Sequence, residues 1–381
     1  MKILADENIP LVKEFFQSIG EVTTCPGRTM TSEDAHNASA LLVRSVTNVN
    51  ESLLKSSDVN FVGTCTIGVD HLDQQWLQSN HINFSSAPGC NANSVVEYVY
   101  AALCHLNVNW LDKKFGIIGC GNVGGLLYKR LKLQGVDCYC YDPFISLDAN
   151  PDLTSLEEVL SCDIISMHTP LTKAGEHPSL HLINLPQLQQ LKANAVLLNC
   201  GRGPVINNSH LLQFLYERND VQVVLDVWEP EPGISLELLD KVALGSPHIA
   251  GYSYDGKLKG TEMIYQALCK HLNRDPDLLI KDLVPALTNN HLQTNVDENT
   301  WEQVKKLIAQ VYSIADDDKR LRALAQRSRT DNEDFSVGFD NLRKNYPTRR
   351  EFHNYQVDGA DSKTIGWLHV LGFGVNTSNN E

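Results

Sequence analysis

Short apolar runs alternate with amphipathic segments along the first part of the chain, up to about residue 90. Four of these runs have the composition of β-strands: KILAD, ALLVRS, VNFVGTCT and INFSSAP, at residues 2–6, 40–45, 59–66 and 82–88. Apolar strands separated by segments with helical spacing are typical of mixed structure. The pattern therefore predicts a small α/β domain at this end of the chain.

The alternation becomes more regular further along. NSVVEYVYAALCHLNVN, residues 93–109, has the apolar spacing of a helix, with Asn93 or Ser94 as its expected N-cap. From Lys114 onward strands and helices repeat, and the strands read FGIIG, VDCYCYD, DIISMHTP, AVLLNCG, VQVVLDV and KVALGSP. Near-continuous apolar strands followed by helices indicate a parallel sheet that is covered on both faces. We therefore expect a doubly wound, Rossmann-type nucleotide-binding core.

The 381 residues exceed what one hydrophobic core usually organises, so we expect several domains. Residues 1–92 and 254–285 are assigned to one discontinuous domain, because we expect the chain after GYSYDGKLKG to return to the first α/β unit. Residues 93–253 are assigned to the nucleotide-binding domain. Residues 286–381 carry a separate helical and aromatic pattern and are expected to form a small C-terminal α+β domain.

A glycine motif lies between the strand FGII and the helix that follows it: Gly119, Cys120, Gly121, Asn122, Val123 and Gly124. In such a motif the glycines permit a tight turn, close approach of the backbone to a pyrophosphate, and close helix packing. The next strand ends in Asp142, 18 residues after the last glycine, where a carboxylate binds ribose hydroxyls and repels a 2′-phosphate. The motif therefore predicts NAD as the cofactor. The alternative is that the glycines only turn the chain and that Asp142 caps a loop.

Polar residues follow three later strands, in the segments NCGRG, LDVWEPEP and SPHIAG. Parallel strands deliver such side chains to one edge of the sheet, where ligands bind. The three segments supply Arg202, a carboxylate and His248. A guanidinium can clamp a substrate carboxylate, and an imidazole can carry a proton under the control of a neighbouring acid.

The composition narrows the function classes further. The formal net charge of −14 disfavours nucleic acid or an anionic membrane as the main partner. No apolar run approaches the ~20 residues that span a bilayer, and the first residues lack a signal-peptide core. The ten cysteines form no CxxC pair and are expected to be reduced. We expect a cytoplasmic protein, and the motifs predict no metal site.

The order GxGxxG, NxGRG, DVxxxEP and PHIAG resembles the D-isomer-specific 2-hydroxyacid dehydrogenases, over roughly residues 1–285. The resemblance implies an NAD-dependent oxidoreductase that acts on the CH–OH group of a 2-hydroxy acid. It implies an α/β fold in which the discontinuous domain is flavodoxin-like and binds substrate. Further likeness in MKILADENIP, LLVRSVTNVN and NYPTRREF points to a branch with a small phosphorylated hydroxy acid as substrate. We expect a homodimer, with residues 286–381 contributing much of the contact.

The resemblance also implies roles for individual residues. Those that match the catalytic residues of the family are Arg202, Glu231 and His248. Those that match its cofactor contacts, besides the glycine motif, are Asp142, Thr169, Asp226 and Gly251. Those that match substrate contacts are Ser45, Thr66 and Tyr252, and Arg44 is our own addition, as a positive charge beside Ser45.

Several alternatives remain open at this point. Glu229 also precedes a proline and competes with Glu231, and His168 competes with His248. Another dehydrogenase of the same family, such as one that acts on 3-phosphoglycerate, would carry the same catalytic set. An NAD-sensing binding protein with this fold would carry it without turnover.

Overall fold

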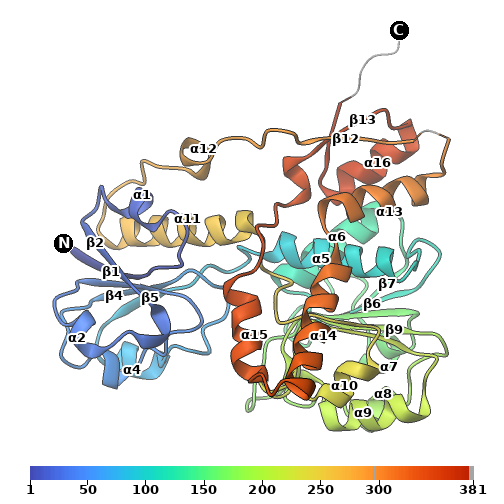
Figure 1. Cartoon of the computed structure of the whole chain (residues 1–381), viewed down its shortest axis with the longest axis horizontal. Helices are drawn as coiled ribbons and strands as arrows, with labels where there is room; N and C mark the ends of the chain where they lie inside the picture. Colours follow the sequence, from blue (N-terminus) through green and yellow to red (C-terminus); the bar gives the residue numbers. More distant parts are fainter. Residues whose placement is uncertain (296, 377–381) are drawn as a thin grey trace. The chain divides into compact units, whose positions relative to one another are not determined.

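The structure is a computed structural model that describes residues 1–295 and 297–376. Contacts between residues divide it into two compact units (Figure 1). The first unit comprises Met1–Asn91 and Ser253–Ala286, and the second comprises Ala92–Tyr252 and Leu287–Glu381. The C-terminal segment thus groups with the nucleotide-binding region, and its standing as a third domain stays a prediction.

The first unit is built on a five-stranded parallel sheet in the order β2-β1-β3-β4-β5. This is the order of flavodoxin-like sheets. The strands are β1 (Lys2–Asp6), β2 (Glu21–Cys25), β3 (Ala40–Val43), β4 (Phe61–Thr64) and β5 (Asn83–Ser85). Strand β2 is absent from the sequence-based prediction, because this edge strand has no buried side chain and therefore shows no apolar pattern.

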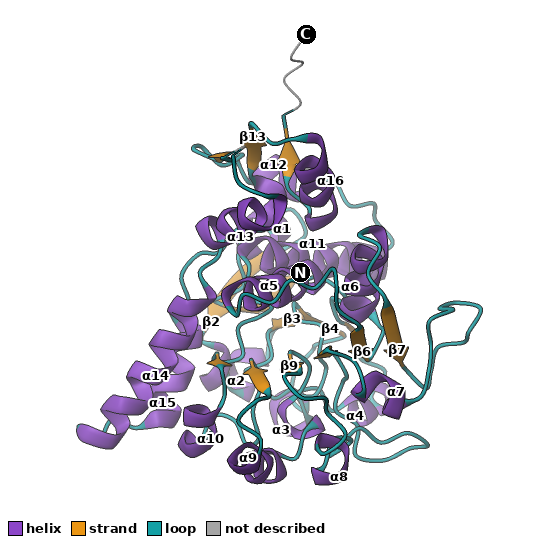
Figure 2. Cartoon of the chain, turned by 90° about the vertical axis from the view of Figure 1, so that its right-hand side faces the viewer, coloured by secondary structure: helices purple, strands orange, loops and turns teal. Residues whose placement is uncertain are grey.

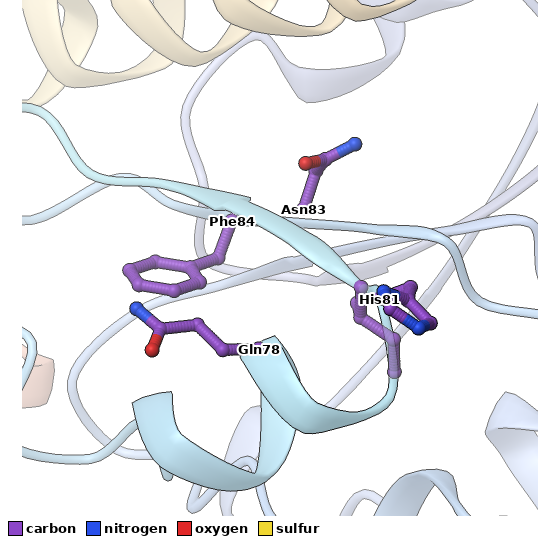
Figure 3. Close-up of a pocket in the computed structure, with 5 residues that line it drawn as sticks. Gln78, His81, Asn83 and Phe84 are labelled. Carbon is purple, nitrogen blue, oxygen red and sulfur yellow. The ribbon is translucent and has the colours of Figure 1, made fainter.

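Helices cover both faces of this sheet. One face packs on α1 (Val12–Phe16) and α11 (Tyr254–His271), where the rings of Phe15 and Tyr265 lie 5.4 Å apart. The other elements of the unit are η1 (Gly27–Thr29), α2 (Ser32–Ala35), α3 (Glu51–Leu54), α4 (Gln74–Ser79) and α12 (Ile280–Leu283). A pocket between α4 and β5 is lined by Gln78 and residues 81–84 (Figure 3). It contains none of the candidate site residues.

The second unit contains a six-stranded parallel sheet in the order β11-β10-β9-β8-β6-β7. Its strands are β6 (Phe115–Ile118), β7 (Cys138–Tyr141), β8 (Ile164–Met167), β9 (Val196–Asn199), β10 (Gln222–Leu225) and β11 (Leu244–Gly245). The chain runs from β6 outward to β7 and then crosses to β8 on the other side of β6. Ligands of doubly wound sheets bind at such a switch point, beside the carboxyl ends of the strands.

Helix α5 (Ala92–His105) opens the second unit and is almost entirely buried. The helix includes Asn93 and Ser94, so the expected N-cap at either residue was wrong. Their side chains have other partners: Asn93 donates to Glu97, and Ser94 donates to the Ala250 carbonyl oxygen. The remaining helices around the sheet are α6 (Asn122–Leu133), α7 (Leu156–Leu160), α8 (Leu185–Leu188), η2 (Gly203–Val205), α9 (Asn208–Glu217) and α10 (Leu236–Lys241).

The C-terminal segment adds helices and a small parallel sheet to the same unit (Figure 2). Its elements are β12 (His291–Gln293), α13 (Thr300–Val311), α14 (Ile314–Thr330), α15 (Phe335–Lys344), η3 (Phe352–Asn354), β13 (Gln356–Asp358), α16 (Ser362–Leu371) and β14 (Gly374–Val375). Helix α13 packs on α5, and the ring of Trp110 lies 5.3 Å from Trp301 and 6.1 Å from Trp367. One apolar core therefore joins this segment to the nucleotide-binding region.

This shared core predicts cooperative unfolding of the second unit. Leu307 on α13 is 1% exposed, so Leu307→Ala is expected to lower the free energy of unfolding by about 2–5 kcal/mol. Gln310→Ala on the exposed side of the same helix is the control, with an expected change within about 0.5 kcal/mol. Denaturant unfolding followed by tryptophan fluorescence measures both, because Trp110, Trp301 and Trp367 report on this unit. A separate transition for the C-terminal segment, alone shifted by Leu307→Ala, would contradict the shared core.

Candidate active site

The glycine motif has the shape of a dinucleotide cradle. Gly119 follows β6 with a φ of +86°, a conformation that L side chains rarely adopt. An added Cβ on Gly124 would lie 2.0 Å from the Gly119 carbonyl oxygen, so the helix can approach the strand only through a glycine. An added Cβ on Gly121 would meet nothing within 4 Å. This open side and the N-terminus of α6, which begins at Asn122, leave room and amide donors for a phosphate group.

Asp142 lies immediately after β7 and is fixed by backbone donors. Its two carboxylate oxygens accept from the amides of Cys120 (2.9 Å) and Phe144 (3.0 Å). Each oxygen keeps further lone pairs for ribose hydroxyls. Thr169 follows β8 across the switch point, and its hydroxyl donates to the Ile118 carbonyl oxygen at 3.2 Å. The arrangement fits a dinucleotide that carries no 2′-phosphate.

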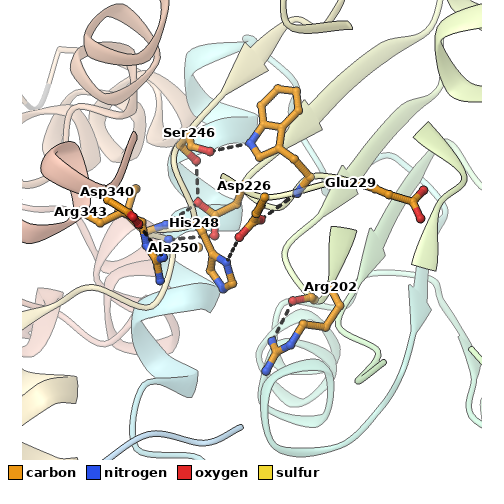
Figure 4. Close-up of polar contacts among 12 residues, drawn as sticks. Arg202, Asp226, Glu229, Ser246, His248, Ala250, Asp340 and Arg343 are labelled. Atoms are coloured by element: carbon orange, nitrogen blue, oxygen red, sulfur yellow. Dashed lines mark hydrogen bonds and ion pairs between the residues drawn. The ribbon is translucent and has the colours of Figure 1, made fainter. Parts of the chain in front are cut away.

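The buried carboxylate of Asp226, at the end of β10, organises the loop that carries His248 (Figure 4). It accepts hydrogen bonds from the Ser246 hydroxyl (2.6 Å) and from the amides of Ile249 (2.7 Å) and Ala250 (3.0 Å). The Asp226 carbonyl oxygen also accepts from the His248 amide at 2.7 Å. Burial raises the pKa of Asp226, and these hydrogen bonds and the charge of His248 act against that rise. The predicted cofactor contact of Asp226 stays a prediction.

His248 and Glu231 form the central pair of the site. The His248 Nδ1 atom lies 2.7 Å from Glu231 Oε2, and Glu231 Oε1 accepts from the Trp228 amide at 2.9 Å. His248 has a φ of +57°, a left-handed conformation that is uncommon for residues other than glycine and that the surrounding hydrogen bonds hold in place. The loop thus directs the imidazole to one partner.

The charge state of Glu231 determines the tautomer of His248. Burial alone would raise the pKa of Glu231, but the charge and hydrogen bond of His248, the Trp228 amide and the charge of Arg343 together lower it. An ionised carboxylate can only accept a hydrogen bond, so Nδ1 of His248 donates to it. Nε2 is then the nitrogen that can take up or release a proton.

Arg202 follows β9 in a turn shaped by Asn199. The Asn199 side chain donates to the Arg202 carbonyl oxygen at 3.1 Å and accepts from the Gly201 amide at 3.1 Å. One Arg202 guanidinium nitrogen donates to the Gly201 carbonyl oxygen at 3.0 Å. A half-exposed guanidinium has further donors for a carboxylate.

The C-terminal segment contacts the same loop, which the sequence analysis missed. Arg349 is buried, donates to the Ala250 carbonyl oxygen at 2.7 Å and lies over the ring of Tyr312 at 4.2 Å. Tyr252, which follows Gly251, packs edge-on against Tyr346. The run NYPTRREF was used only as a mark of resemblance, and two adjacent arginines beside aromatic residues are the signal that it offered.

The other predicted substrate residues lie in the first unit. Ser45 is exposed after β3, and the Thr66 hydroxyl bonds to the Thr64 hydroxyl (2.7 Å) and the Gly68 carbonyl oxygen (3.1 Å). Arg44 Nε lies 3.1 Å from the buried carboxylate of Asp6. The charge of Arg44 is therefore partly balanced within its own unit. The roles of these residues stay predictions.

The two competing residues have other partners. Glu229 pairs with His181, at 2.7 Å from Oε1 to Nε2, rather than with His248. His168 bonds to the Ser166 hydroxyl at 2.9 Å, and burial lowers its pKa to about 3. A ring that stays neutral at physiological pH is poorly suited to donate a proton there. The geometry therefore favours Glu231 and His248 as the working pair.

No helix within residues 1–295 and 297–376 has both the length and the apolar character needed to cross a membrane. No group of three or more His, Cys, Asp and Glu side chains in the described residues is arranged to hold a metal ion.

Comparison with known proteins supports this description. Residues 103–250 match the family model for the D-isomer specific 2-hydroxyacid dehydrogenase, NAD binding domain. Residues 283–372 match a domain of unknown function (DUF3410). An erythronate-4-phosphate dehydrogenase of Cellvibrio japonicus is 63% identical over 98% of this chain and 99% of its own length. A second erythronate-4-phosphate dehydrogenase, from Saccharophagus degradans, is 46% identical over 98% of this chain and 99% of its own length.

Solved structures share the fold. The D-lactate dehydrogenase of Aquifex aeolicus, complexed with NAD and lactic acid, aligns with a TM-score of 0.60 at 22% identity. The alignment covers 72% of this chain and 96% of the D-lactate dehydrogenase chain. The 3-phosphoglycerate dehydrogenase of Entamoeba histolytica, with NAD+ bound, aligns with a TM-score of 0.62 at 22% identity. This alignment covers 76% of our chain and 99% of that dehydrogenase. About a quarter of this chain therefore has no counterpart in these structures.

The lowered pKa of Glu231 predicts a pH-dependent contribution to stability. A carboxyl group whose pKa is lower in the folded state stabilises the fold at pH values above ~4.3, its pKa in the unfolded chain. This stabilisation is lost as the pH falls through the pKa of the folded state. Glu231→Gln should therefore be less stable than the wild type near pH 7, by roughly 1–3 kcal/mol. Urea denaturation at decreasing pH should show the difference shrinking below about pH 4. An equal difference at all pH values would show that Glu231 is not held ionised.

Proposed function

Because this chain belongs to the erythronate-4-phosphate dehydrogenases, within the D-isomer-specific 2-hydroxyacid dehydrogenases, we propose that it oxidises 4-phospho-D-erythronate with NAD. The product is 2-oxo-3-hydroxy-4-phosphobutanoate, in the biosynthesis of pyridoxal 5′-phosphate. The observation that carries the proposal is the 2.7 Å contact between His248 and Glu231 at the edge of a sheet whose other loops hold Arg202 and the glycine motif.

In the proposed mechanism the protein transfers the proton of the substrate hydroxyl and orients the substrate by its carboxylate. NAD, when bound, supplies the acceptor for the hydride that leaves C2 of the substrate. His248 Nε2 accepts the proton of the C2 hydroxyl, since Nδ1 already donates to Glu231. Glu231 stabilises the imidazolium that results, and the guanidinium of Arg202 holds the substrate carboxylate. In the reverse direction the imidazolium returns the proton to the 2-oxo group.

The cradle residues have the task of holding the cofactor. The backbone of Gly119–Gly124 would hold the pyrophosphate of NAD, and Asp142 would accept hydrogen bonds from the ribose hydroxyls. Thr169, Asp226 and Gly251 complete the set of proposed cofactor contacts. Ser45, Thr66 and Tyr252 are the proposed substrate contacts.

The formation of NADH, followed by absorbance, tests the proposed function directly. Purified protein should oxidise 4-phospho-D-erythronate in preference to 3-phosphoglycerate, glycerate and lactate. A preference for 3-phosphoglycerate would make the chain another dehydrogenase of the family. Binding of NAD without turnover of any acid in the panel would indicate an NAD-sensing protein.

We also propose a homodimer in a reducing, cytoplasmic compartment. The compartment is supported by the ten cysteines, all of which are free. Dimerisation through the C-terminal segment is supported by its three-stranded sheet, whose outer strands β12 and β14 are edges, and by the exposed Val337. With the net charge of −14, we expect neither nucleic acid nor a membrane as partner.

Sedimentation of the full-length chain tests the dimer. A sedimentation coefficient that matches a monomer at micromolar concentration would contradict it. Truncation near residue 286 is a poor test, because Leu307 and Phe352 contribute to the core of the second unit. The truncated chain would aggregate whether or not the segment mediates dimerisation.

His248→Ala should lower the turnover number by roughly two to four orders of magnitude, the usual contribution of a positioned acid or base. NAD affinity should change little, because the imidazole handles the substrate proton. Steady-state rates of oxidation and reduction measure the turnover number. Near-wild-type turnover of His248→Ala would assign the proton to another residue.

Asp142→Ala should weaken NAD binding more than NADP binding, because the carboxylate binds ribose hydroxyls and repels a 2′-phosphate. Dissociation constants from the quenching of protein fluorescence by both cofactors measure the ratio. Asp240→Ala, which removes an exposed carboxylate on α10, is the control and should leave the ratio unchanged. A wild type that prefers NADP would refute the role of Asp142.

A further inference from the structure

An arginine of the C-terminal segment lies beside the proposed catalytic pair. Arg343 is on α15, within the segment that matches the separate domain model and outside the match to the NAD-binding domain. Its guanidinium carbon lies 5.7 Å from the centre of the Tyr252 ring, and its side chain hydrogen-bonds to Tyr252. Its charge acts on Glu231, the partner of His248. Figure 4 draws Arg343 and Asp340 together with the catalytic residues.

The bonding of Arg343 is incomplete. The side chain is 17% exposed, and its Nε atom is buried without a hydrogen-bond partner among the described residues. The ion pair between Arg343 Nη1 and Asp340 is long, at 3.9 Å. A buried N–H without a partner costs free energy unless a ligand or water accepts its hydrogen bond. Arg343 therefore has donor capacity for an anion at the site.

The charge of the substrate requires such a donor. A phosphate ester carries about −1.5 to −2 at neutral pH, in addition to the carboxylate. Arg202 can balance the carboxylate only. Arg44 is paired with the buried Asp6. Arg349 also has two nitrogen atoms without a hydrogen-bond partner, but it is only 5% exposed, and its guanidinium lies over the Tyr312 ring. Arg343 is the arginine whose charge acts on Glu231, and its ion pair with Asp340 is longer than that of Arg44 with Asp6.

We propose that Arg343 is a substrate-binding residue that selects a phosphorylated acid by pairing its guanidinium with the phosphate. The proposal rests on the proposed function and specifies how the substrate is recognised. The planar guanidinium matches phosphate oxygens bidentately, which a lysine does not. The C-terminal segment, which lies outside the match to the NAD-binding domain, thus contributes directly to specificity.

Two ligands that differ only in the phosphate test the proposal. The Michaelis constant for 4-phospho-D-erythronate is compared with the competitive inhibition constant of D-erythronate, which is obtained whether or not D-erythronate is oxidised. Arg343→Gln should weaken binding of the phosphorylated acid roughly 10- to 100-fold, and it should weaken binding of D-erythronate less than about twofold. Arg343→Lys should recover only part of the loss, because the charge remains without the fork.

Controls separate this role from a structural one. Arg329→Gln removes the same charge from α14, where Arg329 pairs with Asp240 at 2.7 Å, and should leave both constants unchanged. NAD affinity and melting temperature should match the wild type in all variants. Two results would show that Arg343 only positions Glu231 and would overturn the proposal. One is an equal loss of affinity for 4-phospho-D-erythronate and D-erythronate. The other is a lower turnover number with a shifted pH profile and an unchanged Michaelis constant.

Binding of inorganic phosphate, measured by titration calorimetry, separates this inference from the proposed function because it needs no turnover. Wild-type protein should bind phosphate in the presence of NAD, and Arg343→Gln should bind it at least tenfold more weakly. If the wild type oxidises no hydroxy acid yet shows this difference, the proposed function fails and the phosphate site stands. Equal phosphate affinity in both proteins would remove the site.

Discussion

The buried carboxylate of Asp226 is the interaction on which the rest of the site depends. It accepts hydrogen bonds of 3.0 Å or less from the Ser246 hydroxyl and from the amides of Ile249 and Ala250. The main-chain carbonyl oxygen of Asp226 accepts a further hydrogen bond from the His248 amide. These bonds hold His248 in a conformation that it would rarely adopt in an unconstrained chain. The imidazole therefore lies 2.7 Å from Glu231, in the arrangement that the proposed proton transfer needs.

The same loop is held from its other side by the C-terminal segment. Arg349 donates to the Ala250 carbonyl oxygen, and the Tyr346 ring packs against Tyr252. The segment is joined to the nucleotide-binding region by an apolar core that includes Trp110 and Leu307. The segment thus contacts the loop that carries His248, and the charge of its Arg343 acts on Glu231.

The sequence alone predicted the parts of the site that depend on local rules. The glycine motif and Asp142 follow from spacing after a strand, and Arg202 and His248 follow from the rule that parallel strands end at one edge. The choice of Glu231 over Glu229 came from the resemblance to the family. The NAD cofactor, the fold class and the family were confirmed by the comparisons. The residue roles stay proposals.

Other features were beyond local rules. The start of α5 was misplaced because Asn93 and Ser94 bond to residues far away in the sequence. Strand β2 lacked an apolar pattern because it lies at the edge of its sheet. Arg343 contacts Tyr252 and Arg349 contacts Ala250, each about a hundred residues earlier in the sequence. No periodicity or motif predicts which charged side chain such a segment brings to a site.

The central claim is that a hydride leaves C2 of the substrate while His248 takes the hydroxyl proton. Oxidation of 4-phospho-D-erythronate deuterated at C2, with mass analysis of the cofactor, tests it most directly. The account predicts NADH that carries one deuterium per turnover, with little label in the solvent. Unlabelled NADH, with the deuterium released to water, would show that the C–H bond at C2 is broken by proton abstraction and would contradict the account.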